Sequence, residues 1–150
     1  MTINARGRGW FRAGAITLIL FGLVHLLAVY NALWGQPRNE HEIVIRREAQ
    51  AYREKLGPFE PSAWGAMQIL NSSYSVLLLF AGCLDLAALS IARGPAELRR
   101  FAMLSAIFMV LVAAIALAFQ FPPPAVFAML ALVFFGLSYR AMRGEPAAPH

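Results

Sequence analysis

The hydrophobic pattern divides the chain into four long apolar runs separated by polar segments. The runs cover about residues 11–34, 64–92, 101–119 and 123–139. At about 1.5 Å rise per residue the first reaches about 36 Å, against a hydrocarbon core of roughly 30 Å. Trp10 and Trp34 bracket this run, as aromatic residues do at membrane interfaces. The pattern therefore predicts four transmembrane helices.

The first run also resembles the core of a cleaved signal peptide, because Arg6 and Arg8 precede it. Such cores are about 7–15 residues long and end at a small-residue cleavage site. This run is longer, and no Ala-x-Ala site follows it. We therefore expect it to be retained as a membrane span.

The polar connection between the first two runs contains a helical pattern of its own, over about residues 40–56. Asn39 and Glu42 have the spacing of a capping box, and Gly57-Pro58 is typical of a helix end. One narrow apolar stripe is formed by Ile45, Ala49, Tyr52 and Leu56. The charged residues, Arg46 among them, are expected on the other faces. Their mixed signs favour a lid or partner-facing helix over an anionic-lipid anchor, and a solvated connector helix is the simpler interpretation.

Two short connections are expected between the remaining runs. Residues 93–100 contain a Gly-Pro pair and three arginines, and they are predicted to form a tight turn. Residues 120–124 are predicted to form a rigid hairpin, since proline can open a helix but cannot continue one. The first ten residues are expected to be a tail, and residues 144–150 a disordered one.

Composition indicates the same class of protein. The chain is 59% hydrophobic and 14% charged, whereas soluble domains are about 45–50% apolar and about 25% charged. The net charge of +5 is compatible with nucleic-acid binding, but the basic residues flank apolar runs, where membrane topology explains them. We expect one domain, residues 1–150, forming an all-α integral membrane four-helix bundle with an amphipathic helix in its first loop. Its partner is the lipid bilayer and not nucleic acid.

The arginines predict an orientation. Eight of them lie in the N-terminal segment, the second connection and the C-terminal segment: Arg6, Arg8, Arg12, Arg93, Arg99, Arg100, Arg140 and Arg143. In the long first connection five cations are matched by five glutamates. The positive-inside rule therefore puts both termini in the cytoplasm and the long connection outside a cell membrane of the bacterial inner-membrane type.

Polar residues lie at membrane depth in the second run. Its spacing of i, i+4, i+7, i+11 and i+14 predicts one stripe, formed by Asn71, Ser75, Leu78, Gly82 and Asp85. Small and polar residues on one stripe are typical of helix–helix contacts in membranes. We favour packing for this stripe, although the same positions can line a ligand cavity.

His25 is predicted to lie level with the polar start of that stripe. By helix rise it is about 14 Å below Trp34, and residues 71–74 are about 10–15 Å below Trp64. Because the first two spans are antiparallel, we expect a hydrogen bond from His25 to Asn71, Tyr74 or Ser75. These four residues are the candidate polar pocket, and a purely structural pair is the favoured interpretation.

Asp85 lies about 10 Å from the cytoplasmic end of its span, too far along the axis to pair with His25. Its candidate partners are Arg12, Arg93, Arg99 and Ser105. An ion pair with arginine is favoured over a proton-carrying role. The single cysteine, Cys83, is expected to be a small apolar core residue.

No catalytic or cofactor motif is found in the sequence. Zinc sites need about three protein ligands, whereas His25, His41 and His150 fall in three different parts of the predicted topology. A haem held by two buried histidines would need two copies of the chain. There is no glycine-rich phosphate loop, nucleophile elbow or CxxC pair. We therefore expect no catalytic residue, no metal and no cofactor.

The segments Ser73–Leu86 and Phe121–Leu137, with His25 in the first run, resemble a family of small bacterial four-span integral membrane proteins of unassigned function. The resemblance extends over most of the chain. It implies the four-helix fold and a bacterial inner membrane, and it implies no activity.

The leading interpretation is a non-enzymatic membrane component that acts through partners, as an accessory subunit of a larger membrane complex or as a homo-oligomer. The alternative is a binder or enzyme for a lipid, quinone or other apolar small molecule, with a pocket near His25, Asn71 and Tyr74. A weaker alternative is a proton-coupled transporter that uses Asp85 and His25.

Overall fold

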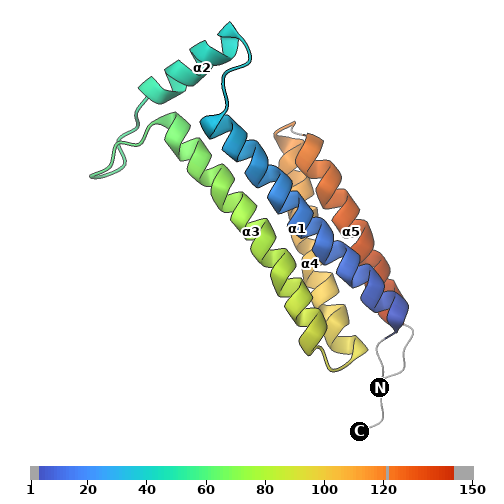
Figure 1. The fold of residues 1–150 in the computed structure, drawn as a ribbon. Coiled ribbons are helices and arrows are strands. Elements are labelled where there is room, and N and C mark those ends of the chain that lie inside the picture. Colours follow the sequence, from blue (N-terminus) through green and yellow to red (C-terminus); the bar gives the residue numbers. More distant parts are fainter. Residues whose placement is uncertain (1–3, 121, 144–150) are drawn as a thin grey trace. The chain divides into compact units, whose positions relative to one another are not determined.

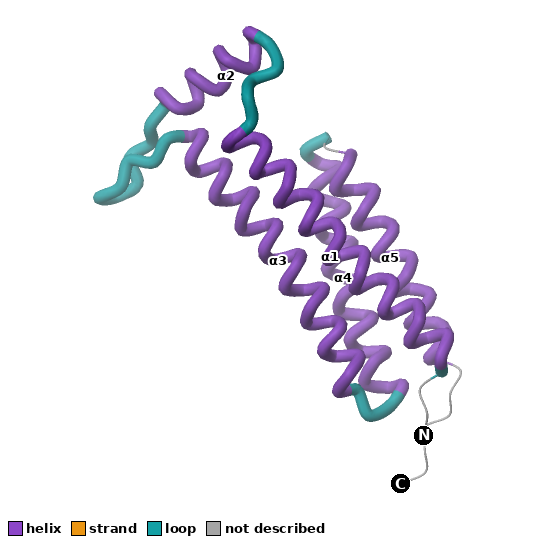
Figure 2. The backbone as a smooth tube through the Cα atoms, viewed as in Figure 1, coloured by secondary structure: helices purple, strands orange, loops and turns teal. Residues whose placement is uncertain are grey.

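The computed structural model describes residues 4–120 and 122–143, which form five helices. These are α1 (Ala5–Trp34), α2 (Glu40–Ala51), α3 (Ala63–Ile91), α4 (Pro95–Ala118) and α5 (Pro122–Arg143) (Figure 1). Among the described residues, extended pairing is limited to isolated bridges within 53–62 (Figure 2). The all-α fold class is therefore confirmed, while the predicted disordered tail at 144–150 lies outside the described residues.

Four of the helices, α1, α3, α4 and α5, are long and apolar enough to cross a membrane, as expected of a multi-pass membrane protein. Each corresponds to one predicted span, and α3 agrees with its prediction to within one residue at both ends. The others extend further: α1 begins at Ala5, α4 begins at Pro95 and α5 ends at Arg143. The added turns contain arginine, a good helix former, so the helices continue where the apolar runs stop.

Local capping fixes two of these starts. The side-chain oxygen of Asn4 accepts a hydrogen bond from the Arg6 N–H at 2.9 Å, as an N-cap does. Pro95 occupies the first turn of α4, and the Glu97 carboxylate accepts a hydrogen bond from the Arg93 N–H at 2.9 Å. The predicted turn over 93–100 was therefore wrong for residues 95–100, which are helical.

The chain divides into two compact units. The core unit comprises residues 1–21 and 78–150, and so contains the start of α1, the second half of α3, α4 and α5. The loop unit comprises residues 22–77, and so contains the rest of α1, α2 and the first half of α3.

Aromatic pairs and close helix contacts pack the core unit. The rings of Phe11 and Phe135 meet edge to face with centroids 5.5 Å apart. Gly82 brings α3 directly against α1, because a Cβ placed there would lie 2.8 Å from the carbonyl oxygen of Ala15 and 2.7 Å from Ile19 Cγ1. Small residues that admit such close approach are typical of helix contacts in membranes.

The arginine-bearing segments meet at one end of the core unit. The buried Ser138 hydroxyl in α5 donates a hydrogen bond to the Gly7 carbonyl oxygen in α1 at 2.8 Å. The Arg99 guanidinium carbon in α4 lies 5.8 Å from the ring centroid of Tyr139 in α5. The start of α1, the α3–α4 turn and the end of α5 thus lie together, and the α4–α5 turn lies at the opposite end (Figure 1).

The loop unit differs from its prediction in the length of α2. The helix ends at Ala51, and Tyr52 is extended, with φ −72° and ψ 118°. A hairpin follows, in which Leu56 N–H donates to Phe59 O at 2.8 Å and Phe59 N–H donates to Leu56 O at 3.1 Å. Gly57 has φ +61°, which a type II′ turn needs at its first central position. Gly57-Pro58 therefore turns a hairpin, and the prediction of a helix as far as residue 56 was wrong.

Candidate functional site

His25 and Ser75 form a polar link between α1 and α3 within the loop unit. The distance from His25 Nδ1 to Ser75 Oγ is 2.8 Å, so Ser75 is the partner among the three that were predicted. The Ser75 hydroxyl also donates to the Asn71 carbonyl oxygen at 3.1 Å. A hydroxyl has a single hydrogen, so His25 Nδ1 is the donor to Ser75, which in a neutral imidazole is the Nδ1–H tautomer.

The rest of the predicted pocket surrounds this link. The Tyr74 ring packs edge-on against the His25 ring, with centroids 5.1 Å apart and an interplanar angle of 79°. Asn71 takes part through its backbone carbonyl group. Ser75 is fully buried, while His25, Asn71 and Tyr74 are partly exposed. Chemically, this arrangement holds α1 and α3 in register by one side-chain hydrogen bond, worth about 1 kcal/mol in a membrane.

Asp85 makes a different contact from the one favoured above. Its Oδ1 accepts a hydrogen bond from the Ser105 hydroxyl at 2.8 Å, and its side chain is 7% exposed. Among the described residues, the one ion pair recorded joins Arg46 to Glu42, so the arginine pair expected for Asp85 was wrong. Ser105 lies one helix away at the same depth, whereas arginine heads reach toward water from the ends of their helices.

The predicted stripe of α3 is largely buried, and Cys83 lies outside it. Ser75, Leu78, Gly82 and Asp85 are all buried. Cys83 follows Gly82 in the helix and is therefore turned by about 100° away from the face that meets α1. It is exposed, so its prediction as a core residue was wrong.

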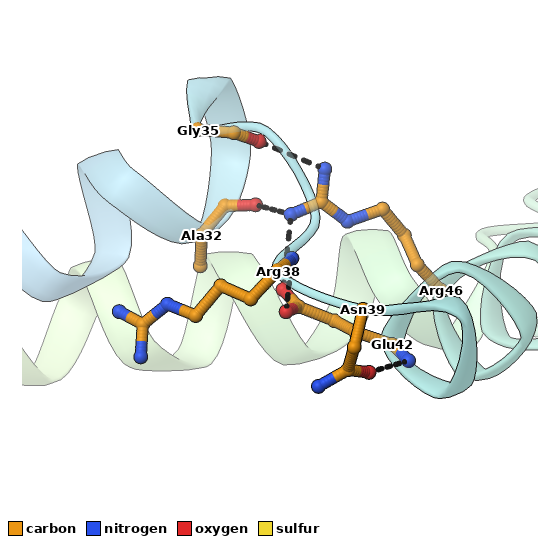
Figure 3. A network of polar contacts seen from close by, with 6 residues as sticks. All are labelled: Ala32, Gly35, Arg38, Asn39, Glu42 and Arg46. Carbon is orange, nitrogen blue, oxygen red and sulfur yellow. Dashed lines mark hydrogen bonds and ion pairs between the residues drawn. The ribbon is translucent and has the colours of Figure 1, made fainter.

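Arg46 was expected on the polar faces of α2, away from the other helices. It instead organises the loop unit. Its Nη2 donates to the Ala32 carbonyl oxygen at 2.8 Å, and its Nη1 donates to the Gly35 carbonyl oxygen at 3.2 Å (Figure 3). Its guanidinium carbon lies 5.1 Å from the centroid of the Trp64 ring at the start of α3. Arg46 thus ties α2 to the end of α1 and to the beginning of α3.

Glu42 lies beside Arg46 at the start of α2, which Asn39 caps. The Glu42 N–H donates to the Asn39 side-chain oxygen at 2.8 Å, which confirms the predicted N-cap. The Glu42 carboxylate accepts the Arg38 N–H at 2.9 Å, one residue earlier than the capping-box partner, and lies 3.8 Å from Arg46 Nη2 (Figure 3). One signal for this junction was present in the sequence: α1 has no basic residue in its last turn, so its end carbonyls need donors from elsewhere.

The apolar residues of α2 and the hairpin are exposed. The exposed fractions are 50% for Ile43, 51% for Val44, 50% for Ile45, 63% for Tyr52, 55% for Leu56 and 71% for Phe59. We call these six residues the loop surface. The predicted stripe through Ile45, Ala49, Tyr52 and Leu56 is not one helix face, because its last two members lie beyond the end of α2.

Among the described residues, no group of three His, Cys, Asp or Glu side chains is placed to hold a metal ion. Comparison of the chain with protein-family models, with curated proteins and with solved structures finds no match.

Proposed function

We propose that this protein is a non-enzymatic component of a bacterial inner membrane that acts by binding a second protein chain through its loop surface. Both termini lie in the cytoplasm, and the loop surface faces the periplasm. Supporting this orientation, the arginine-bearing ends of the helices gather at one end of the core unit. The resemblance to small bacterial four-span membrane proteins motivates the choice of membrane.

The observation that carries the proposal is an apolar surface on a segment that is tethered in place. Six large apolar side chains of the loop surface are at least half exposed, although they lie outside the four helices long enough to span a membrane. Three of them, Ile43, Val44 and Ile45, are consecutive in α2, and exposed apolar patches mark interaction sites. Arg46 fixes this segment to α1 and α3, so a partner that binds the loop surface pays less to order it.

Charge distinguishes a protein partner from the bilayer surface. Helices that lie on anionic membranes are rich in lysine and arginine on their polar face. In the first connection five cations are balanced by five glutamates. Attraction to anionic lipid is therefore weak, while a mixed-charge rim around an apolar centre is typical of protein interfaces.

The polar groups of the spans favour structural work over catalysis. His25 is bonded to Ser75, Asp85 to Ser105, and Ser138 to the Gly7 carbonyl group. Each of these bonds joins two helices of the same chain. A proton-coupled mechanism would instead need groups that exchange protons along a path, and Asp85 and His25 belong to separate links.

Site-specific photocrosslinking in cells tests the proposal. A photoreactive amino acid is placed at Val44 or Phe59 of the loop surface, with Leu70 of α3, which is 70% exposed, as the control position. We expect discrete protein adducts from the two loop positions and only lipid adducts from Leu70. Mass spectrometry of the adducts separates a second copy of this chain from a different protein. Lipid adducts alone at Val44 and Phe59 would contradict the proposal.

A further inference from the structure

A cleft opens between α3 and α4 in the core unit, with Leu18 of α1 among its lining residues. Its volume is about 380 Å³, within the range of small-molecule sites. The walls are almost entirely apolar and include Leu84, Phe101 and Phe108. Two polar side chains, Asp85 and Ser105, also line it. An apolar cavity with very few polar groups is the usual form of a site for an apolar ligand.

The hydrogen bond between the two polar residues determines what they can still bind. Ser105 donates its one hydroxyl hydrogen to Asp85 Oδ1 at 2.8 Å. When Asp85 is ionised, its Oδ2 and the lone pairs of Ser105 Oγ remain as acceptors. A carboxyl group buried at membrane depth with one hydrogen bond is stabilised further by any donor that enters the cleft.

We propose that this cleft binds an apolar molecule through a hydroxyl group that donates to Asp85. A molecule whose polar groups are only carbonyls, such as an oxidised quinone, brings an acceptor where a donor is required. A phospholipid whose phosphate binds Arg93, beyond the end of α3, places its acyl chain at Asp85, since the six helical residues from Asp85 to Ile91 alone span about 9 Å. A single-chain alcohol satisfies both the apolar walls and the carboxyl group.

The test uses the full-length protein purified in detergent micelles and two photoreactive probes of one chain length. The probes are hexadecanol and its methyl ether, each with a diazirine in the chain. We expect hexadecanol to label residues 81–91 and 101–108, and its methyl ether to label them about tenfold less, the effect of one hydrogen bond to a charged group. Equal labelling by alcohol and ether would overturn the proposal.

Two further variants separate loss of the site from loss of the fold. Ala87→Phe adds bulk at an exposed position that lines the cleft, and Ala114→Phe adds the same bulk at an exposed α4 position outside it. Ala87→Phe is expected to abolish selective labelling, and Ala114→Phe to leave it intact. Ser105→Ala, which frees Asp85 Oδ1 as an acceptor, is expected to retain the preference for alcohol over ether. Loss of selectivity in Ala114→Phe, or its survival in Ala87→Phe, would place the ligand elsewhere and overturn the assignment.

Discussion

The guanidinium group of Arg46 lies over the indole ring of Trp64, with 5.1 Å between the guanidinium carbon and the ring centroid. The same group donates to two carbonyl oxygens at the end of α1. One side chain of α2 therefore contacts both long helices of the loop unit. Charge-assisted hydrogen bonds and a cation–π contact each contribute more than a neutral surface contact does.

Replacing Arg46 is expected to release α2. Arg46→Ala removes two charge-assisted hydrogen bonds and one cation–π contact, a loss of about 2 kcal/mol. Hydrogen exchange of the backbone amides in residues 40–62 should then become roughly thirtyfold faster, while the amides of α4 keep their protection. Arg47→Ala is the matched control, because Arg47 is exposed. Equal exchange in both variants would show that Arg46 does not hold the segment.

Adding one methyl group at Gly82 is expected to push α3 away from α1. The new Cβ of Gly82→Ala would meet the backbone of Ala15, which cannot turn aside as a side chain can. We expect a loss of about 1–3 kcal/mol in the free energy of unfolding, measured by titration from mild detergent into SDS. Gly136→Ala is the control, because no atom lies within 4 Å of its added Cβ. It should be neutral or stabilising by up to about 1 kcal/mol.

Removing the Ser75 hydroxyl is expected to leave His25 Nδ1 without its bond to α3. Ser75→Ala should cost about 1 kcal/mol of unfolding free energy in the same titration. Ser73→Ala, at an exposed position of the same helix, should cost nothing measurable. Nitrogen-15 NMR of labelled histidine should show the Nδ1–H tautomer in the native protein. A signal from the Nε2–H tautomer would contradict the donor assignment at Ser75.

The orientation can be measured with single cysteines. In a Cys83→Ser background, Glu48→Cys in α2 and Ala96→Cys at the start of α4 both lie at exposed positions. A membrane-impermeant maleimide should label the first in intact cells and the second only after permeabilisation, because arginine-rich segments remain cytoplasmic. The reverse pattern would invert the proposed topology.

The number and approximate limits of the long helices could be predicted because apolar runs of this length have few alternatives. The link between His25 and Ser75 was predictable for a related reason. Trp34 and Trp64 mark the interface on two antiparallel helices, so helix rise alone brings residues 25 and 75 to the same depth. Depth does not determine the rotation of each helix about its own axis. For this reason Cys83 was predicted to be a core residue, although it is exposed.

Short-range signals were less reliable where two structures share one pattern. Gly57-Pro58 is compatible with a helix end and with a hairpin turn, and only the exit of the chain at Tyr52 decides between them. The inward position of Arg46 depends on where α2 lies, which its own spacing does not determine. Ser105 was among the candidate partners of Asp85 and lies at the same depth. Arginine was favoured because a carboxylate near an arginine-rich membrane edge usually forms an ion pair.

The bond from Ser138 to Gly7 has a consequence for how the chain is made. α1 leaves the ribosome before α5, whose Ser138 follows Gly7 by 131 positions in the chain. At about 5–20 residues per second, α1 waits on the order of ten seconds for α5. During that interval the face of α1 that will pack against Phe135 and Ser138 has no packing partner. A chaperone or an insertase can bind it. Chains truncated before α5 would keep this face of α1 unpacked permanently. They would be substrates for the quality-control proteases of the membrane.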